Sequence, residues 1–580
     1  MGIRLAETAG FCWGVRRAVD LALRVSHENH GPIYTFGPLI HNRQALDLLK
    51  TKGIDQLPKE ADRLGPASVI VRAHGVAPQV KQDLEDRGFE VLDATCPHVA
   101  RAQKIVRRMA EKACAAIVIV GDRGHAEVEG LLGHADGRGF VVESPEEVAR
   151  LPDGLDSVAV VAQTTQGGDR WEQCVAALAA RFGDIEVFNT RCNDTNSRQE
   201  ELLRMAEEVD AIVVVGGRGS ANTCRLAEIA RERVPTWHIE TAEELPVDAL
   251  RPFGEIGVTA GASTPHWIIE QVVDRLRAMQ RQRRPLLVRA PAAGGRLLIL
   301  GQVVLAAGAA ALAAAAAQIM QIPYRWEYSV LPFLYLWAMH LLHLFATLPR
   351  DLSLVSGPMR AFAGWRRQAL AIGLTSLAGG LILSALMGAW VFALVALSTL
   401  VGTVYSFGRL PRTVLPHFRF RRLHNIPGSK DACVAAAWAM MVVIVPWVHA
   451  RSWTGLEIHH ILPLLVTATF AYGLSLVRSV AVDLRQLEGD LLLGRETLPV
   501  FIGPRRTHAL LTSMLAILCI LALGGLVAAP LRSGLILLPT VALMAVAYAL
   551  TYGQRIRSYY AWAFLLDLPF LVAGVLGVVL

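Results

Sequence analysis

Three cysteines occupy the same kind of position in the N-terminal half of the chain. Cys12, Cys96 and Cys192 each follow a strand-like or turn segment and precede a helix-like run, at separations of 84 and 96 residues. A helix N-terminus favours the thiolate, the form of cysteine that binds metal. Three thiolates could hold an iron-sulfur cluster and leave its fourth iron open. Spacing alone also fits three core cysteines, so both interpretations stay open here.

Polar side chains gather in the turns that follow the predicted strands. Glycines in these turns expose backbone N–H groups that can bind phosphate oxygens. The turns lie at the carboxyl ends of parallel strands, where ligands bind in α/β proteins. A carboxyl group beside a histidine could transfer protons if burial raises its pKa. The residues are His41, His74, His125, Thr164, Ser220, Asn222 and Ser263, with Glu127 as the carboxyl group.

The elements that must position these residues are short β-rich runs alternating with amphipathic helical stretches over residues 1 to 270. This alternation predicts an α/β fold with parallel sheets. The remaining cysteines of this half lack the strand-to-helix context, so we expect them in the core. The predicted strands are 68–72, 116–120, 158–162, 211–215 and 256–259.

Charge and hydropathy divide the 580 residues into two halves. Residues 1–300 hold 37 of the 57 Lys and Arg and 41 of the 50 Asp and Glu, a net charge of −4, whereas residues 301–580 carry +11. The overall +7 therefore does not indicate a nucleic-acid partner. With 53% hydrophobic residues, disordered and collagen-like classes are excluded. No secretory signal is visible at the start, so we expect a cytoplasmic first half without disulfides.

Nine apolar runs in the second half are each near the roughly 20 residues that span a bilayer as a helix. The connecting segments that would face the cytoplasm carry 17 basic residues and the opposite ones carry three. This asymmetry predicts a protein of the inner (cytoplasmic) membrane with its N-terminus inside and its C-terminus outside. The runs are 297–321, 328–348, 368–387, 389–407, 431–450, 458–477, 508–529, 533–552 and 560–580.

An acidic run follows the sixth apolar segment, in the inner connection that we place at 478–507. On a helix, Asp483, Gln486 and Asp490 recur at i, i+3 and i+7 on one face, which suits a magnesium ion that holds a diphosphate. A solvated loop at the membrane edge would explain the acids equally well.

The segment 483–503 resembles the second aspartate-rich motif of the UbiA superfamily of membrane prenyltransferases, with its Thr-Leu-Pro-Val stretch and final glycine. The family's first motif, Asn-Asp-x-x-Asp-x-x-x-Asp, is missing. The second span has His340 and His343 instead, which we expect to be polar groups packed between helices. The resemblance implies magnesium at Asp483 and Asp490, prenyl transfer to a membrane lipid or lipid-soluble acceptor, and weakened ionisation of the diphosphate.

The motifs of the first half, taken together, resemble the IspH or LytB family of 4-hydroxy-3-methylbut-2-enyl diphosphate reductases over nearly all of residues 1–276. The resemblance implies a trefoil of three α/β modules around a [4Fe-4S] cluster held by Cys12, Cys96 and Cys192. The motifs are Gly10-Phe-Cys12, Ile40-His41-Asn42, Ala73-His74-Gly75, Thr95-Cys96-Pro97, Gly124-His125-x-Glu127, Gln163-Thr164-Thr165, Cys192-x-x-Thr195 and Gly261-Ala-Ser263.

The same resemblance implies a role for each polar residue of the turns. The three histidines line the pocket and bind diphosphate, two serines and an asparagine hold its other oxygens, Thr164 contacts the substrate hydroxyl, and Glu127 supplies protons. Ala221 replaces a serine that is common in the family. The implied reaction is reductive dehydroxylation to isopentenyl and dimethylallyl diphosphate, with electrons from a ferredoxin or flavodoxin. The three histidines are His41, His74 and His125, and the two serines and the asparagine are Ser220, Ser263 and Asn222.

These patterns predict three segments: a reductase domain at 1–276, an Arg-rich juxtamembrane linker at 277–296 and a nine-helix membrane domain at 297–580. Three interpretations of the fusion remain. The chain is a reductase joined to an active prenyltransferase, a reductase with a degenerate membrane anchor or binding module, or a prenyltransferase with an iron-sulfur sensor.

Overall fold

The computed structural model describes the chain in two compact units, Met1–Arg283 and Arg284–Leu580. Part of the predicted Arg-rich linker, 277–296, lies outside the described residues, and its first residues belong to the helix His266–Gln282. The three domain limits stay a prediction. The described residues are 2–28, 31–58, 67–112, 115–155, 157–183, 185–282, 294–348, 357–407, 426, 428–450, 461–493, 497–528, 532–552 and 559–580.

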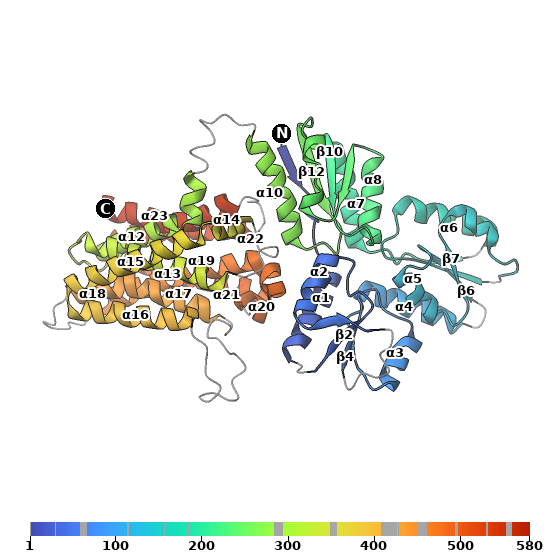
Figure 1. Ribbon diagram of the computed structural model, residues 1–580, viewed down its shortest axis with the longest axis horizontal. Helices are drawn as coiled ribbons and strands as arrows, with labels where there is room; N and C mark the ends of the chain where they lie inside the picture. Colours follow the sequence, from blue (N-terminus) through green and yellow to red (C-terminus); the bar gives the residue numbers. More distant parts are fainter. Residues whose placement is uncertain are drawn as a thin grey trace. The chain divides into compact units, whose positions relative to one another are not determined.

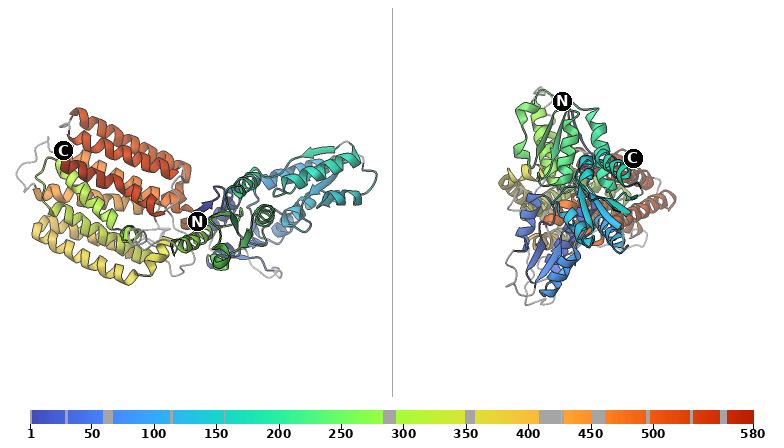
Figure 2. Two further views of the ribbon diagram at one scale, coloured as in Figure 1. Left: turned by 90° about the horizontal axis from the view of Figure 1, so that it is seen from above. Right: turned by 90° about the vertical axis from the view of Figure 1, so that its right-hand side faces the viewer.

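The first unit contains three four-stranded sheets, and every strand pairing among its described residues is parallel. The sheet orders are β3-β2-β4-β5, β7-β6-β8-β9 and β11-β10-β12-β1. The three modules are therefore the same arrangement repeated (Figures 1 and 2). The strands are β2 Ile33–Phe36, β3 Ile54–Gln56, β4 Ser68–Val71, β5 Glu90–Asp93, β6 Ala115–Val120, β7 Gly139–Val142, β8 Ser157–Ala162, β9 Ile185–Phe188, β10 Ala211–Val215, β11 Thr236–Ile239, β12 Glu255–Ala260 and β1 Gly2–Leu5.

The third module takes its fourth strand from the other end of the unit. β1 pairs with β12 from Gly2 opposite Glu255 to Leu5 opposite Val258. In Figure 1 this N-terminal strand, in dark blue, lies beside the green strands of the third module. The first and second modules instead take their fourth strands, β5 and β9, from the chain that directly follows them.

Helices cover the sheets, and the predicted α/β class with parallel sheets is confirmed. Central strands such as β4 and β10 are buried along their whole length, as apolar strands of parallel sheets are. The helices are α1 Trp13–Glu28, α2 Arg43–Thr51, α3 Pro78–Asp86, α4 Pro97–Ala110, α5 Ala126–His134, α6 Gly168–Phe182, α7 Asn193–Ala206, α8 Ala221–Arg231, α9 Val247–Leu250 and α10 His266–Gln282.

The second unit is helical and membrane-integral. Among its described residues, eight helices are long and apolar enough to cross a bilayer, and the bent pair Gly294–Leu300 and Val303–Ile319 makes a ninth if it counts as one span. The longer helices are α12 Val303–Ile319, α13 Glu327–Thr347, α15 Arg366–Met387, α16 Ala389–Phe407, α17 Ser429–Ala439, α19 Ile461–Leu493, α21 Pro504–Ala528, α22 Arg532–Tyr552 and α23 Tyr559–Val579; a short π-helical turn and α18 Val445–Ala450 continue α17.

The helix of the sixth predicted span continues past residue 477. α19 runs without a break for 33 residues, from Ile461 to Leu493, so Asp483, Gln486 and Asp490 lie on a helix, as their spacing predicts, and not in a loop. Two charged side chains of α19 form ion pairs with other helices: Arg478 pairs with Asp567 of α23, and Asp483 pairs with Lys430 of α17. Paired charges of this kind can lie inside a helix bundle without facing lipid.

Candidate functional site

Each of the three cysteines predicted to bind metal lies at the N-terminus of a helix. Cys12 directly precedes α1, and Cys96 and Cys192 are the N-cap residues of α4 and α7. The carbonyl oxygen of each accepts the first helical N–H bond, at 3.0 Å from Arg16 N, 2.8 Å from Ala100 N and 3.1 Å from Asn196 N. The same local structure therefore occurs three times.

One backbone hydrogen bond anchors each cysteine to the turn after the third strand of its module. The amide nitrogens of Cys12, Cys96 and Cys192 donate to the carbonyl oxygens of Ala262, Ala73 and Thr164, at 3.0, 2.9 and 2.8 Å. All three cysteines line one cavity with an empty volume of about 740 Å³. The repeated anchor explains how residues so far apart in the chain converge there.

The three cysteines of the cavity fit a cluster of several atoms better than a single ion. The three sulfur atoms do not lie close enough together to ligate one ion. A Cβ atom on Gly14 would lie 2.6 Å from the Cys96 sulfur and 3.9 Å from the Cys12 sulfur, so only glycine leaves these sulfurs their space. Three thiols from three modules around one cavity match the ligand set of a [4Fe-4S] cluster with an open iron.

Burial opposes the thiolate that a helix N-terminus favours. It raises the pKa of the Cys12 thiol to about 11, although the Val15 N–H, 3.4 Å from the sulfur, lowers it. Burial also raises the pKa of Cys96. For these two cysteines burial therefore outweighs the effect of the helix N-terminus. Metal binding must release their protons, so cluster loading is coupled to pH.

The three predicted histidines form a compact group on the cavity wall. The ring centroids of His41, His74 and His125 are 4.5, 5.6 and 6.0 Å apart. Burial lowers the pKa of all three, that of His125 to about 4, so the rings are neutral at pH 7. His41 Nε2 and His74 Nδ1 are buried without a partner among the described residues. Buried polar atoms of this kind indicate a polar ligand.

The third module adds the remaining polar groups to the same cavity. Ser263 Oγ donates to the His41 carbonyl at 3.2 Å and lies 3.4 Å from Ser220 Oγ. Asn222 is only 4% exposed, and neither polar atom of its side chain has a partner among the described residues. Ala221 also lines the cavity. The structure thus brings all eleven predicted residues of the first half together in one cavity.

Glu127 is a buried carboxyl group held by one neighbour. It is 1% exposed, and its two oxygens accept hydrogen bonds from the Thr164 backbone N–H at 2.7 Å and the Thr164 hydroxyl at 2.8 Å. Burial raises the pKa of Glu127 to about 7, even though both bonds from Thr164 lower it. A carboxyl group with a pKa near neutrality can both give and take a proton.

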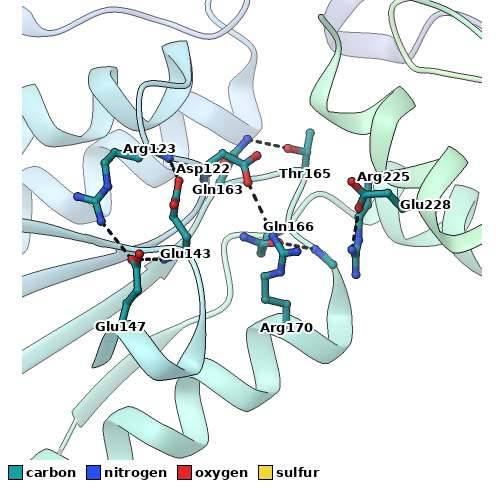
Figure 3. Close-up of polar contacts among 11 residues, drawn as sticks. Asp122, Arg123, Glu143, Glu147, Gln163, Thr165, Gln166, Arg170, Arg225 and Glu228 are labelled. Atoms are coloured by element: carbon teal, nitrogen blue, oxygen red, sulfur yellow. Dashed lines mark hydrogen bonds and ion pairs between the residues drawn. The ribbon is translucent and has the colours of Figure 1, made fainter. Parts of the chain in front are cut away.

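Gln163 supports this pair, a role that the sequence did not reveal. Its side chain is fully buried; Oε1 accepts from the Asp122 backbone N–H at 2.7 Å, and Nε2 donates to the Thr165 hydroxyl at 3.0 Å. Figure 3 shows the side chain joining the turn after β6 to the turn after β8. Gln163 therefore fixes the two turns that carry Glu127 and Thr164. The position of Gln163 next to Thr164 in the Gln163-Thr164-Thr165 motif was the sequence feature that could have indicated this role.

The membrane domain has a buried charged cluster of its own. Lys430 contacts Asp483, which is 1% exposed, and Asp431 accepts from the Ser479 hydroxyl at 2.6 Å. Asp490 is also buried, and it adds to the negative field around Lys430. One oxygen of Asp431 and one of Asp483 have no partner among the described residues. No local pattern connects Lys430 with Asp483, because the two residues are 53 positions apart in the chain.

His343 of the second span and Asp567 of the last span also make polar contacts between helices. His343 Nδ1 lies 3.3 Å from the Ser406 hydroxyl of α16. Arg478 Nε donates to Asp567 at 2.7 Å. These contacts join α13 to α16 and α19 to α23, as expected of polar groups packed between membrane helices.

Comparisons with known proteins divide the chain at the same place. The LytB protein family matches residues 3–277, and the UbiA prenyltransferase family matches residues 349–565. A curated 4-hydroxy-3-methylbut-2-enyl diphosphate reductase from Anaeromyxobacter sp. (strain Fw109-5) is 43% identical over 286 residues, which are 49% of this chain and 100% of that protein.

Two solved structures resemble the two halves. The (E)-4-hydroxy-3-methyl-but-2-enyl diphosphate reductase described as the terminal enzyme of the non-mevalonate pathway is 40% identical, with a TM-score of 0.39, over 48% of this chain and all of that one. A UbiA homolog from Aeropyrum pernix K1 is 13% identical, with a TM-score of 0.38, over 48% of this chain and 99% of that one. The chain therefore belongs to the LytB family of 4-hydroxy-3-methylbut-2-enyl diphosphate reductases through its N-terminal half, and its C-terminal half is a UbiA-like membrane domain.

Proposed function

We propose that the first unit reduces (E)-4-hydroxy-3-methylbut-2-enyl diphosphate to isopentenyl and dimethylallyl diphosphate. One observation carries this proposal: a single cavity contains three cysteines, three histidines and a buried carboxyl group with a pKa of about 7. Cys12, Cys96 and Cys192 would hold a [4Fe-4S] cluster, which supplies electrons one at a time when bound.

The polar wall of the cavity would bind the diphosphate. His41 Nε2, His74 Nδ1 and the Asn222 amide are the buried groups that lack partners, so a phosphate oxygen can use them without breaking an existing bond. Ser220 and Ser263 add two hydroxyl donors beside them. A bound anion favours the charged form of each histidine, so diphosphate binding would raise their lowered pKa values and take up protons.

Glu127 and Thr164 would handle the proton at the reacting end. The reaction breaks the bond between carbon and the hydroxyl oxygen, consumes two electrons and two protons, releases water and forms one carbon–hydrogen bond. Glu127 is protonated in about half of the molecules at pH 7, because burial raises its pKa to about 7. It can give that proton to the departing oxygen while the Thr164 hydroxyl orients the substrate hydroxyl. A ferredoxin or flavodoxin would supply the electrons.

The test is product formation by the full-length protein in detergent, reconstituted with iron and sulfide without oxygen and supplied with reduced methyl viologen. Both five-carbon products should form from the hydroxylated diphosphate. Cys96→Ser should abolish the reaction, whereas Cys224→Ser should not, because Cys224 does not line the cavity. Full activity in Cys96→Ser would overturn the proposal.

We further propose that the reductase unit is cytoplasmic, that the protein lies in the inner (cytoplasmic) membrane and that the C-terminus is outside. The 17 to 3 distribution of basic residues between the two sets of connections supports this orientation. Labelling of single cysteines placed at residue 580 and at exposed positions of the first unit, with a reagent that does not cross the membrane, tests it. Labelling of the first unit in intact cells would contradict the proposed orientation.

A second candidate function, prenyl transfer to a lipid-soluble acceptor, is favoured by the unpartnered oxygens of Asp431 and Asp483. A magnesium ion at Asp483 and Asp490 would satisfy such oxygens and could hold a diphosphate. Lys430 already supplies one positive charge there, and we find no first aspartate motif in the sequence. Purified protein with magnesium, membrane extract and labelled prenyl diphosphates should move label into lipid, and the Asp483→Asn/Asp490→Asn variant should not. Equal transfer by both proteins rejects this function.

A further inference from the structure

Helix α4 presents an exposed face with only positive charge. Its 14 residues include four basic residues and no acidic one. Arg101, Lys104 and Arg108 are exposed and lie within about 60° of one another around the helix axis, at 100° per residue. His98 extends the same face toward the start of the helix and is also exposed. We call Arg101, Lys104 and Arg108 the α4 basic face.

The charges of this face are not neutralised within the protein. Among the described residues, Arg101, Lys104 and Arg108 have no acidic partner, whereas several other basic residues of the unit do. Arg87, the C-cap residue of α3, lies 3.3 Å from Asp83, and Arg225 of α8 lies 3.0 Å from Glu228. Since the first half of the chain has a net charge of −4, the α4 basic face is a local excess of positive charge there.

The α4 basic face leads directly to the candidate cluster site. α4 begins after Cys96, and the exposed His98 lines the same cavity as the cysteines. Arg108 is 12 residues beyond Cys96, about 18 Å along the helix. A second exposed side chain, Trp13, follows Cys12 and is 63% exposed. Arg17 of α1 donates to the Thr95 carbonyl at 2.8 Å, so the starts of α1 and α4 are joined.

We infer that the α4 basic face is the docking surface for an acidic electron-carrier protein. This inference rests on the proposed reductase function, which consumes two electrons that the chain itself does not supply. Charged faces steer a weakly binding partner and fix its orientation, and the encounters of electron-transfer proteins bury little surface. A carrier held against α4 would present its redox group near Cys96 and His98.

The composition of α4 favours a protein partner over a lipid surface. A helix that lies on a membrane needs an apolar face beside its basic one. The larger apolar residues of α4 are directed into the unit: Val99, Val106 and Met109 are buried, and the half-buried Ile105 packs against the same core. Of the apolar residues of α4, only Pro97 and Ala100 are exposed. The basic face therefore has no large exposed apolar side chain beside it on this helix.

The test compares two electron donors on the full-length, cluster-loaded protein in detergent. The variant is Arg101→Glu/Lys104→Glu/Arg108→Glu, and the donors are a reduced bacterial flavodoxin of net negative charge and reduced methyl viologen. With flavodoxin at low salt, kcat/KM should fall about tenfold or more, because loss of steering slows association. With methyl viologen, activity should stay unchanged.

A matched control carries the same change of charge elsewhere on the unit, as Arg204→Glu/Arg231→Glu/Arg233→Glu. These three residues are exposed and far along the chain from α4. The control variant should keep its activity with flavodoxin, and that activity should still decrease as the salt concentration rises. Equal loss in both triple variants would reduce the effect to net charge and overturn the proposed surface. Inactivity of the unmodified protein with methyl viologen would instead contradict the proposed reductase function.

A second measurement separates the protein partner from lipid. Hydrogen exchange of α4 is followed in nanodiscs of zwitterionic and of anionic lipid, with and without flavodoxin. Protection of α4 by flavodoxin in both lipids supports the inference. Protection by anionic lipid alone would assign the basic face to the membrane surface and overturn it.

Discussion

Replacing Glu127 with glutamine tests the proton chemistry of the cavity most directly. Burial raises the pKa of this carboxyl group from 4.5 to about 7. At about 1.4 kcal/mol per pKa unit, the shift corresponds to about 3 kcal/mol of preference for the protonated form. Glutamine keeps the shape of the side chain, and its oxygen can still accept the Thr164 N–H bond that Glu127 accepts at 2.7 Å. The substitution removes the ionisable proton, and the Thr164 hydroxyl, which donates to Glu127 at 2.8 Å, must instead accept from the glutamine NH2 group.

The expected result is a loss of activity together with a changed pH profile. The rate with saturating methyl viologen should fall by about 10²-fold or more, which is the usual contribution of a positioned acid. In the unmodified protein kcat/KM should decline as the pH rises through about 7, because the proton donor is lost. This decline should be absent in Glu127→Gln. The matched control is Glu129→Gln, which removes an exposed carboxyl group two residues away and should leave the profile unchanged.

The raised pKa of Glu127 also predicts the direction in which the stability of the protein changes with pH. The pKa of Glu127 in the folded protein lies above the unfolded value of 4.5. The stabilisation that Glu127 contributes to the folded state is therefore complete below pH 4.5 and is lost as the pH rises through about 7. Native-state hydrogen exchange measures the free energy of opening of β8. Between pH 5 and pH 9, this free energy should increase in Glu127→Gln relative to the unmodified protein by up to about 3 kcal/mol. A pH-independent difference, or an unaltered pH–rate profile in Glu127→Gln, would refute the reasoning.

Three further predictions concern other parts of the chain. Gly14→Ala places a Cβ atom 2.6 Å from the Cys96 sulfur and should lower the iron content after reconstitution, whereas Gly31→Ala, with open space around it, should not; equal iron in both variants contradicts the tight site. His125→Asn keeps a good helix cap but removes a titratable ring, so calorimetry in buffers of different ionisation enthalpy should show less proton uptake on pyrophosphate binding; unchanged uptake assigns the protons elsewhere. Lys430→Met leaves Asp483 buried without its cation and should destabilise the membrane domain by about 3 kcal/mol in thermal unfolding, and Asp483→Leu in the same protein should restore most of the loss; no recovery means the pair is not coupled.

Local patterns in the sequence were sufficient to predict the parts of the site that depend on neighbouring residues. Strand, turn and helix follow one another within a few residues of Cys12, Cys96 and Cys192, so the helix N-termini could be predicted. The parallel sheets and the contents of the cavity followed from the same repeated pattern.

Long-range contacts could not be predicted in the same way. The pairing of β1 with β12 and the contact between Lys430 and Asp483 join residues that no local period connects. The raised pKa of Cys12 depends on the atoms that bury it, which spacing does not reveal. α19 extends past residue 477 because its charges are paired by other helices, and hydropathy alone treats such charges as a loop.

The place of β1 in the third module also sets the order of events while the protein is being made. β1 leaves the ribosome first, but its partner β12 begins only at Glu255, about 12 to 50 s later at 5 to 20 residues per second. Ala262, which anchors the Cys12 amide, is made later still. The first membrane helix follows soon afterwards, at Gly294. The last anchor of the cysteine site and the first membrane helix are therefore made within about 2 to 6 s of each other.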